Sequence, residues 1–218
     1  RVPHVPAAAL RHQFQPAHTP PQTHLKRFLL PYDLVIPALE NNDTLKYLQT
    51  YAQNNRAEIL FDFDAYAITS SKIESGKLLA DNHIPTPAPY PDGGFPVIVK
   101  PSTGSGSKGI YVFHDTKQLK SHLAKAPGKQ VIQKFVHGPS YSLEVIGYPG
   151  NYRPLQVTEL EVDPVFDCKR VTAPSDLSKK IIADFEYIAV TTAEALKLNG
   201  LMDMEVILDN EVLRVLEI

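Results

Sequence analysis

Apolar positions begin to recur with regular spacing at Tyr32, and the first regular stretch is short. The apolar runs at 33–37 and 59–61 each predict a buried strand. Between them, Leu45 and Leu48 have the spacing of one helix face, which predicts a helix over 42–52. Two strands flanking a helix are half of a doubly wound domain, which is too small to fold alone. We therefore assign 32–66 to the remnant of an N-terminal α/β domain.

The middle of the chain alternates between helical and strand patterns. Ser70 or Ser71 caps a predicted helix that runs to about Asn82 and stops at Pro85 and Pro87. Further on, Asp115 caps a second helix that ends at Leu123. Strands are predicted at 95–100, 110–113 and 130–136, with a glycine-rich turn over 104–109. Residues 67–132 therefore predict a small α/β subdomain.

The last third of the chain predicts a larger subdomain over 133–218. Strands are expected at 141–147 and 152–162, the second as one long alternating strand. The longest helix covers 178–198, and Gly200 should end it in the left-handed conformation. Strands 201–208 and 212–218 form a hairpin around Asp209-Asn210. That turn would place Glu205 near position 214.

Residues 1–31 differ from the rest of the chain. They hold six of the 19 prolines and four of the eight histidines, and no Asp, Glu or Gly. Such a stretch cannot bury enough apolar surface to fold alone, so we expect a low-complexity loop or disorder. The sequence also begins without Met, which suggests a fragment.

Composition narrows the class of protein. One cysteine among 218 residues excludes a disulfide framework and a Cys-rich zinc site, and we expect Cys168 to be a buried or half-buried thiol. A net charge of -2 argues against a basic nucleic-acid binder. No apolar run approaches the ~20 residues of a membrane span. We expect a cytoplasmic α/β protein that handles small molecules; its oligomeric state stays open.

The glycine-rich segment 104–109 is the first candidate for chemistry. It lies between two predicted strands, whereas the glycines of a dinucleotide-binding fingerprint open a helix, and it lacks the Gly-Lys-Ser/Thr of a P-loop. A glycine-rich hairpin can offer backbone N–H groups to phosphate, although a flexible surface turn fits equally well. Lys100 ends an apolar strand beside this loop and has phosphate as a natural partner. Lys72 opens a helix, where the helix dipole disfavours a cation, and this makes it a second candidate. The alternative is that Lys72 is an ordinary solvated lysine at a helix end.

Two carboxylates interrupt the apolar terminal hairpin. Glu205 and Glu217 lie on adjacent predicted strands, where they repel each other unless a positive charge lies between them. Mg²⁺ held by carboxylates and nucleotide phosphates would supply that charge; surface salt bridges, with Arg214 nearby, are the alternative. Ser142 and Glu144 share one face of an earlier strand, which on its own indicates only a half-exposed sheet.

Taken in order, these segments resemble the ATP-grasp superfamily over roughly 32–218. The matching stretches are Lys72, Ile84–Pro87, Val99–Pro101, the 104–109 loop, Gln133–Val136, Ser142–Val145, Asp203–Glu205 and Leu216–Ile218. The resemblance implies an α/β (α+β) fold in which two α/β subdomains grip ATP. It also implies roles by position. Lys72 and Lys100, assigned as catalytic, would contact the ATP phosphates together with the loop residues Ser107 and Lys108. The hinge along the adenine would consist of Gln133, Lys134, Phe135 and Val136. Mg²⁺ would bind Glu205 and Glu217.

Within the superfamily, stretches at 37–41, 60–66, 142–145 and 166–172 resemble the ligases of pyrrolysine biosynthesis. Those enzymes use ATP to join the carboxyl group of 3-methylornithine to the side-chain amine of lysine, through an acyl phosphate. The resemblance implies substrate contacts at Glu40, Ser142, Glu144 and Asp203. The family's N-terminal glycine-containing unit and its last metal ligand are missing, so the chain looks truncated at both ends. An ATP-grasp ligase for another amino-acid pair, an inactive nucleotide-binding remnant and a plain interaction module are the alternatives.

Overall fold

The computed structural model describes residues 34–37, 39, 41–55, 57–104 and 106–218, and it divides the chain into two compact units, Arg1–Ile59 and Leu60–Ile218. In the first unit, β1 (Leu34–Val35) pairs in parallel with β2 (Glu58–Ile59), and α2 (Asn42–Asn55) connects them. Leu45 and Leu48 are the buried residues of α2, as their spacing predicts. The expected strand–helix–strand fragment is therefore confirmed. Among the described residues, no helix has the length and apolarity needed to cross a membrane.

The second unit begins with two short helices, α3 (Phe63–Thr69) and α4 (Lys72–Asp81). Each has a side-chain cap: Asp62 accepts hydrogen bonds from the first amides of α3, and Ser71 accepts one from Glu74 in α4. The cap at Ser71 confirms the predicted start of α4. Helix α3 was not predicted from the sequence. A signal was present, because Asp62 is a residue type favoured at the N-cap and Asp64 puts a second acidic residue in the first turn.

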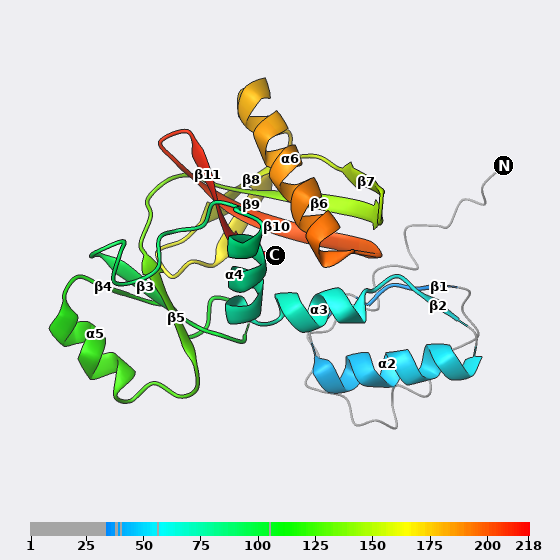
Figure 1. The fold of residues 1–218 in the computed structure, drawn as a ribbon, viewed down its shortest axis with the longest axis horizontal. Helices are drawn as coiled ribbons and strands as arrows, with labels where there is room; N and C mark the ends of the chain where they lie inside the picture. The colour runs from blue at the N-terminus through cyan, green and yellow to red at the C-terminus, as the bar shows by residue number, and fades with distance from the viewer. Residues whose placement is uncertain (1–33, 38, 40, 56, 105) are drawn as a thin grey trace. The chain divides into compact units, whose positions relative to one another are not determined.

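A three-stranded antiparallel sheet follows, with the strand order β4-β3-β5. Its strands are β3 (Val97–Pro101), β4 (Tyr111–Phe113) and β5 (Gln130–Lys134), and we call it the lid sheet. Helix α5 (Thr116–Leu123), capped by Asp115 as predicted, covers one face (Figure 1). Val97, Val99 and Leu119 form the buried core between them. Because side chains alternate along a strand, Ile98 and Lys100 lie on the opposite face of the sheet.

The larger sheet, which we call the large sheet, has the order β11-β10-β6-β8-β9, with β7 also paired to β6. Its strands are β6 (Ser140–Tyr148), β7 (Asn151–Pro154), β8 (Thr158–Val162), β9 (Cys168–Thr172), β10 (Gly200–Asp209) and β11 (Val212–Glu217). Helix α6 (Lys179–Leu196) packs along one face, as Figure 1 shows, and its own Phe185 is fully buried. The other face carries the alternate residues of β6 and β10.

Three details of this sheet differ from the sequence-based expectations. The single strand expected at 152–162 is two strands: β7 pairs with residues 145–148 of β6, and β8 pairs with residues 140–142. The C-cap of α6 is Lys197, which adopts the left-handed conformation with φ 53°. Gly200, expected as that cap, instead opens β10. Strand β9 was not predicted. Its five residues are all exposed, and a strand with no buried face does not need the alternation of apolar and polar residues on which the prediction of strands depends.

The terminal hairpin turns one residue later than expected. Asn210 and Glu211 both have positive φ and form the two-residue turn, with Asp209 opposite Val212. Arg214 therefore lies opposite Ile207, and a bulge between Glu205 and Val206 brings Glu205 directly opposite Glu217. The expectation that Glu205 lies near position 214 is wrong, and the correction places the two carboxylates side by side.

Candidate functional site

A cavity of about 390 Å³ in the second unit gathers most of the polar residues that the sequence singled out. One wall comes from the lid sheet and the glycine-rich loop, and the other from the large sheet and the β8–β9 hairpin. The predicted residues that line it are Lys72, Lys100, Ser107, Lys108, Gln133, Lys134, Phe135, Val136, Glu205 and Glu217. Segments up to 145 residues apart in the sequence thus meet at one place.

Lys100 lies at the end of β3, on the face that lines the cavity. Only 7% of the residue is exposed, and its ammonium forms no hydrogen bond or ion pair with any described residue. Burial lowers the pKa of its ammonium; Glu217 and Glu205 counteract this effect, and Lys72 adds to it. A buried cation without a partner is costly. The arrangement therefore favours an anion that enters the cavity and binds Lys100.

Lys72 reaches the same cavity from the first turn of α4. Its ammonium donates to the carbonyl oxygen of Gly104 at 3.0 Å and to Oε1 of Glu217 at 2.8 Å. The lysine side chain is 13% exposed and the glutamate side chain 44%. Lys72 therefore links the glycine-rich loop to the last strand of the large sheet.

The glycine-rich loop bends through positive φ values that suit glycine. Gly104, Gly106 and Gly109 have φ of 126°, 66° and 77°, and a Cβ at Gly109 would come within 2.9 Å of Pro101. Ser107 donates its hydroxyl hydrogen to the carbonyl oxygen of Phe166, at 2.5 Å. The loop is thus held over the cavity by the β8–β9 hairpin.

The predicted hinge, Gln133–Val136, begins in the last two residues of β5 and is hydrogen-bonded to the segment that precedes β3. Lys134 donates through its amide to the carbonyl oxygen of Ala88 at 2.7 Å and through its ammonium to that of Phe95 at 2.8 Å. The ring of Phe135 meets the ring of Phe166 edge-on, with centroids 6.0 Å apart. These aromatic groups, with Ile98 nearby on the lid sheet, make this end of the cavity suitable for a flat, largely apolar ring.

Glu205 and Glu217 face each other across β10 and β11. Burial raises the pKa of Glu205, and the charges of Asp203 and Glu217 raise it further, while Lys100 and Lys72 oppose the shift. A cation between the two carboxylates would relieve their repulsion, and carboxylate oxygens are ligands that Mg²⁺ prefers. No group of three or more His, Cys, Asp or Glu side chains suited to a metal exists among the described residues. The pair thus fits a metal that takes its remaining ligands from bound phosphates and water.

Ser142, Glu144 and Asp203 lie on the same face of the large sheet but do not line the cavity. Asp203 is opposite Glu144 and Glu205 is opposite Ser142, so the three continue the row of polar residues along β6 and β10. Burial among neighbouring atoms, together with the charge of Glu144, raises the pKa of Asp203 to about 6, although water still reaches its side chain. Ser142 is hydrogen-bonded to Thr158 at 2.9 Å. Glu40, the fourth expected substrate contact, lies outside the described residues.

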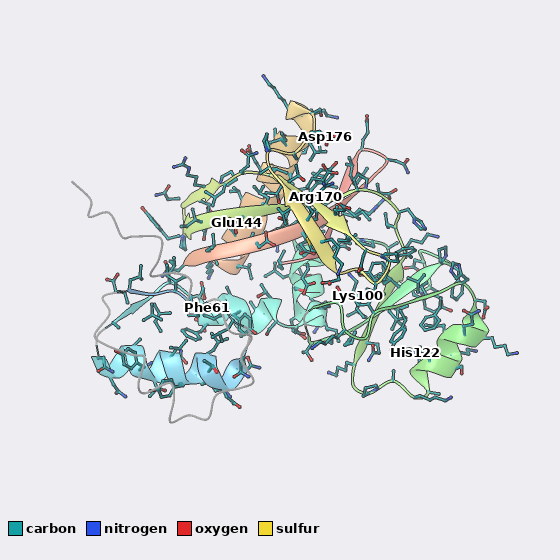
Figure 2. All side chains as sticks on the ribbon, turned by 180° about the vertical axis from the view of Figure 1, so that it is seen from behind. Phe61, Lys100, His122, Glu144, Arg170 and Asp176 are labelled. Carbon is teal, nitrogen blue, oxygen red and sulfur yellow. The ribbon has the colours of Figure 1, made fainter. Side chains whose placement is uncertain are left out.

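Figure 2 shows that Lys100 and Glu144 come from different sheets: Lys100 from the lid sheet and Glu144 from β6 of the large sheet. The β8–β9 hairpin contributes cavity residues that the sequence analysis missed, namely Leu160, Val162, Asp163, Phe166 and Asp167. The sequence did carry a turn signal, the Asp163-Pro164 pair, and in the structure Asp163 accepts hydrogen bonds from the amides of Val165 and Asp167. Cys168 also lines the cavity and is exposed, so the expectation of a buried thiol is wrong.

Comparison with known proteins agrees with this geometry. A family model described as an ATP-grasp domain matches residues 69–218, and the chain therefore belongs to the ATP-grasp family. It is 35% identical over 187 residues to the 3-methyl-D-ornithine--L-lysine ligase of Methanosarcina acetivorans, a match that covers 85% of this chain and 48% of the relative. It is 24% identical to the D-alanine--D-alanine ligase of Lacticaseibacillus casei over 77% of this chain and 53% of that protein. The chain thus spans about half the length of the curated relatives it matches.

A solved structure with the same fold is the biotin carboxylase domain of the Hydrogenobacter thermophilus 2-oxoglutarate carboxylase, in complex with MgADP and bicarbonate. The TM-score is 0.72 at 16% identity, and the match covers 85% of this chain and 47% of that one. At this identity the likeness establishes the fold alone. The predicted α/β (α+β) architecture of the ATP-grasp type is therefore confirmed.

Proposed function

We propose that this chain is the nucleotide-binding part of an ATP-dependent carboxylate–amine ligase. The observation that carries the proposal is the meeting of Lys72, Lys100, Glu205 and Glu217 at one cavity. Two ammonium groups suit the phosphates of ATP, and two carboxylates suit the Mg²⁺ that accompanies them. The aromatic end at Phe135 suits the adenine, and Ser107 and Lys108 lie in the loop that would cover the phosphates.

The reaction we propose has two steps. A carboxylate oxygen of the first substrate attacks the γ-phosphorus, the bond to the bridging oxygen breaks, and ADP leaves with an acyl phosphate remaining. The amine of the second substrate then attacks the acyl carbon, expels phosphate and loses a proton. Lys72 and Lys100 would neutralise the charge that develops on the phosphoryl oxygens, so their contribution is positioning and electrostatic. Mg²⁺, held by Glu205 and Glu217, would add charge neutralisation and hold the phosphates in place.

The substrates we propose are amino acids with two amino groups, with 3-methyl-D-ornithine and L-lysine as the leading pair. The identity to the Methanosarcina ligase supports this choice. The opposed carboxyl groups of Asp203 and Glu144 support it independently, because each substrate ammonium needs an acidic partner. Ser142 and Glu40 complete the proposed substrate contacts.

Nucleotide binding is the first test. Titration calorimetry should show MgATP binding to the wild-type chain, and Lys100→Met should weaken it at least about 100-fold, because a buried charged contact to phosphate is lost. Lys117→Met is the matched control, since Lys117 is an exposed lysine on α5. Equal affinity of wild type and Lys100→Met would refute the assignment.

The substrate pair needs a second measurement. ADP release should be recorded with a panel of amino-acid pairs, including 3-methyl-D-ornithine with L-lysine and D-alanine with itself. Release with the first pair supports the proposal, and Glu144→Gln should then raise the KM for the amine substrate about tenfold, through loss of a charged contact. Release only with another pair would identify a different ligase. ATP binding with no release for any pair, even in a version extended at both ends to match the length of its relatives, would favour an inactive nucleotide-binding protein.

A further inference from the structure

We infer that the Lys72 ammonium holds the place of the metal at Glu217 until nucleotide arrives, and that nucleotide and metal enter by displacing this ion pair together. The inference rests on the proposed function and concerns how its binding site is regulated. The observation behind it is that the predicted phosphate-binding lysine and the predicted metal ligand are hydrogen-bonded to each other at 2.8 Å. In the absence of ligand, the ammonium of Lys72 and the carboxylate of Glu217 therefore bind each other instead of phosphate and metal.

The backbone of Lys72 is held in place, so only its side chain is free to exchange partners. Its amide donates to the carbonyl oxygen of Ser102 at 2.7 Å. The hydroxyl of the capping residue Ser71 lies 3.3 Å from that of Ser102. The ammonium thus starts from a fixed helix end between Gly104 and Glu217, within reach of the cavity.

The charges around Lys72 make one-sided binding unfavourable. A phosphate that bound Lys72 alone would leave Glu217 opposite Glu205, with the repulsion between the two carboxylates offset only by the attraction of Lys100. A metal ion that bound Glu217 alone would leave the ammonium of Lys72 without its carboxylate partner and still repelled by the ammonium of Lys100. This repulsion already lowers the pKa of Lys100. A complex of metal and nucleotide supplies a partner for both groups at once. The ion pair should therefore produce positive coupling between metal and nucleotide.

This arrangement predicts opposite effects from a single substitution. Lys72→Met removes the competitor for Glu217, so the affinity for metal alone should rise about twofold to fivefold, the range expected for loss of a partly exposed ion pair. The same variant should bind metal-free nucleotide more weakly, because a phosphate contact is lost. A residue that merely supported the site would weaken both ligands.

The experiment measures the two ligands separately on the full 218-residue chain. Binding of Mn²⁺ alone is followed by electron paramagnetic resonance, and binding of a fluorescent ATP analogue is followed in EDTA. The control is Lys77→Met, which removes an exposed lysine of the same helix whose partner is Glu74. Lys72→Arg keeps the positive charge and should retain the wild-type affinity for Mn²⁺. Thermal melting checks that each variant folds, and Lys72→Gln replaces the Met variant if that one does not.

Tighter Mn²⁺ binding in Lys72→Met, with weaker nucleotide binding and an unchanged control, supports the inference. Weaker or unchanged Mn²⁺ binding in that variant overturns it, as does an Arg variant that behaves like the Met variant. The Mn²⁺ measurement does not depend on nucleotide. If the wild-type chain binds no nucleotide, the proposed function fails, while the competition between Lys72 and metal is still decided by the Mn²⁺ data.

Discussion

The lid sheet and the large sheet contribute opposite charges to the same cavity. Residues 95–134, which include the lid sheet and α5, contain seven lysines against one aspartate, a net charge of +6, so the rest of the chain carries -8. The lid provides Lys100, Lys108 and Lys134 to the cavity, and the large sheet with its hairpin provides Glu205, Glu217, Asp163 and Asp167. This division teaches how the site is built: one wall suits phosphate and the other suits cations.

The two sheets also differ in how they are stabilised. The core beneath the large sheet joins residues from α3, α4 and α6 to the strands, whereas the buried core of the lid sheet consists of Val97, Val99 and Leu119. Because burial of apolar surface is the main favourable contribution to folding, the lid should open at a lower free energy than the large sheet.

The largest expected effect tests this difference in stability. Phe185→Ala, at a fully buried position under the large sheet, should lower the free energy of unfolding of the whole second unit by about 3–5 kcal/mol. Leu119→Ala should instead increase hydrogen exchange mainly in residues 97–134, because the lid can open alone. Hydrogen exchange read by mass spectrometry distinguishes the two. Equal loss of protection in both sheets after Leu119→Ala would show that they unfold as one.

A second prediction concerns the buried charge of the lid. Lys100→Met should raise the free energy of unfolding at pH 7 by about 1–3 kcal/mol, because it removes a largely buried ammonium that has no hydrogen-bond or ion-pair partner among the described residues. Burial lowers the pKa of Lys100 in the folded state, so the penalty is full below that folded pKa. It decreases as pH rises toward the unfolded value of 10.5, where the ammonium is lost in both states. The wild type should therefore gain stability relative to the variant as pH rises; denaturant titrations across alkaline pH measure the difference, and a constant difference would contradict it.

The acidic wall has its own test. Glu217→Gln should remove most of the advantage that Mg²⁺ gives to nucleotide binding, a loss of about tenfold, because one carboxylate ligand is gone. Binding of metal-free nucleotide should stay the same or improve, since Lys72 loses its partner. Calorimetry with and without Mg²⁺ gives both values, with Glu211→Gln in the terminal turn as the control. An undiminished effect of Mg²⁺ would exclude Glu217 as a ligand.

The smallest expected effect lies where the two walls touch. Ser107→Ala removes the hydrogen bond to Phe166, and such a bond contributes about 0.5–1.5 kcal/mol. Amide exchange in the glycine-rich loop should become faster without nucleotide, and nucleotide affinity should fall about twofold to tenfold. Ser121→Ala, at an exposed position of α5, is the control. Unchanged exchange in the loop would mean that the hairpin does not hold it.

Much of the local structure could be predicted because it depends on neighbours in the sequence. The caps at Ser71, Asp115 and Ser178 each accept a hydrogen bond from an amide three residues later, so the residue types alone indicated where three helices begin. The glycine-rich turn and the lysine at the end of β3 were likewise visible. The order of these motifs also pointed to the family that the comparison shows.

Other features depend on contacts between distant segments. The position of the turn expected from the sequence placed Glu205 near position 214. In the structure, a turn one residue later and a bulge place Glu205 opposite Glu217. Strand register is decided by packing rather than by the turn sequence alone. The pairing of Lys72 with Glu217 joins a helix end to a strand 145 residues later, which no local pattern contains. The exposure of Cys168 follows from its place on β9, an edge strand whose five residues are all exposed.

The amino-acid sequence by itself determined the helix N-caps at Ser71 and Asp115, the buried face of α2 and the kinds of charged residue available for chemistry, because these depend on the geometry of a few adjacent residues. Only the tertiary structure decided which charges meet, that Lys100 has no partner among the described residues, and that Lys72 holds Glu217. The physical reason is that burial and Coulomb interactions depend on distance in space, which the folded chain sets and the order of residues does not.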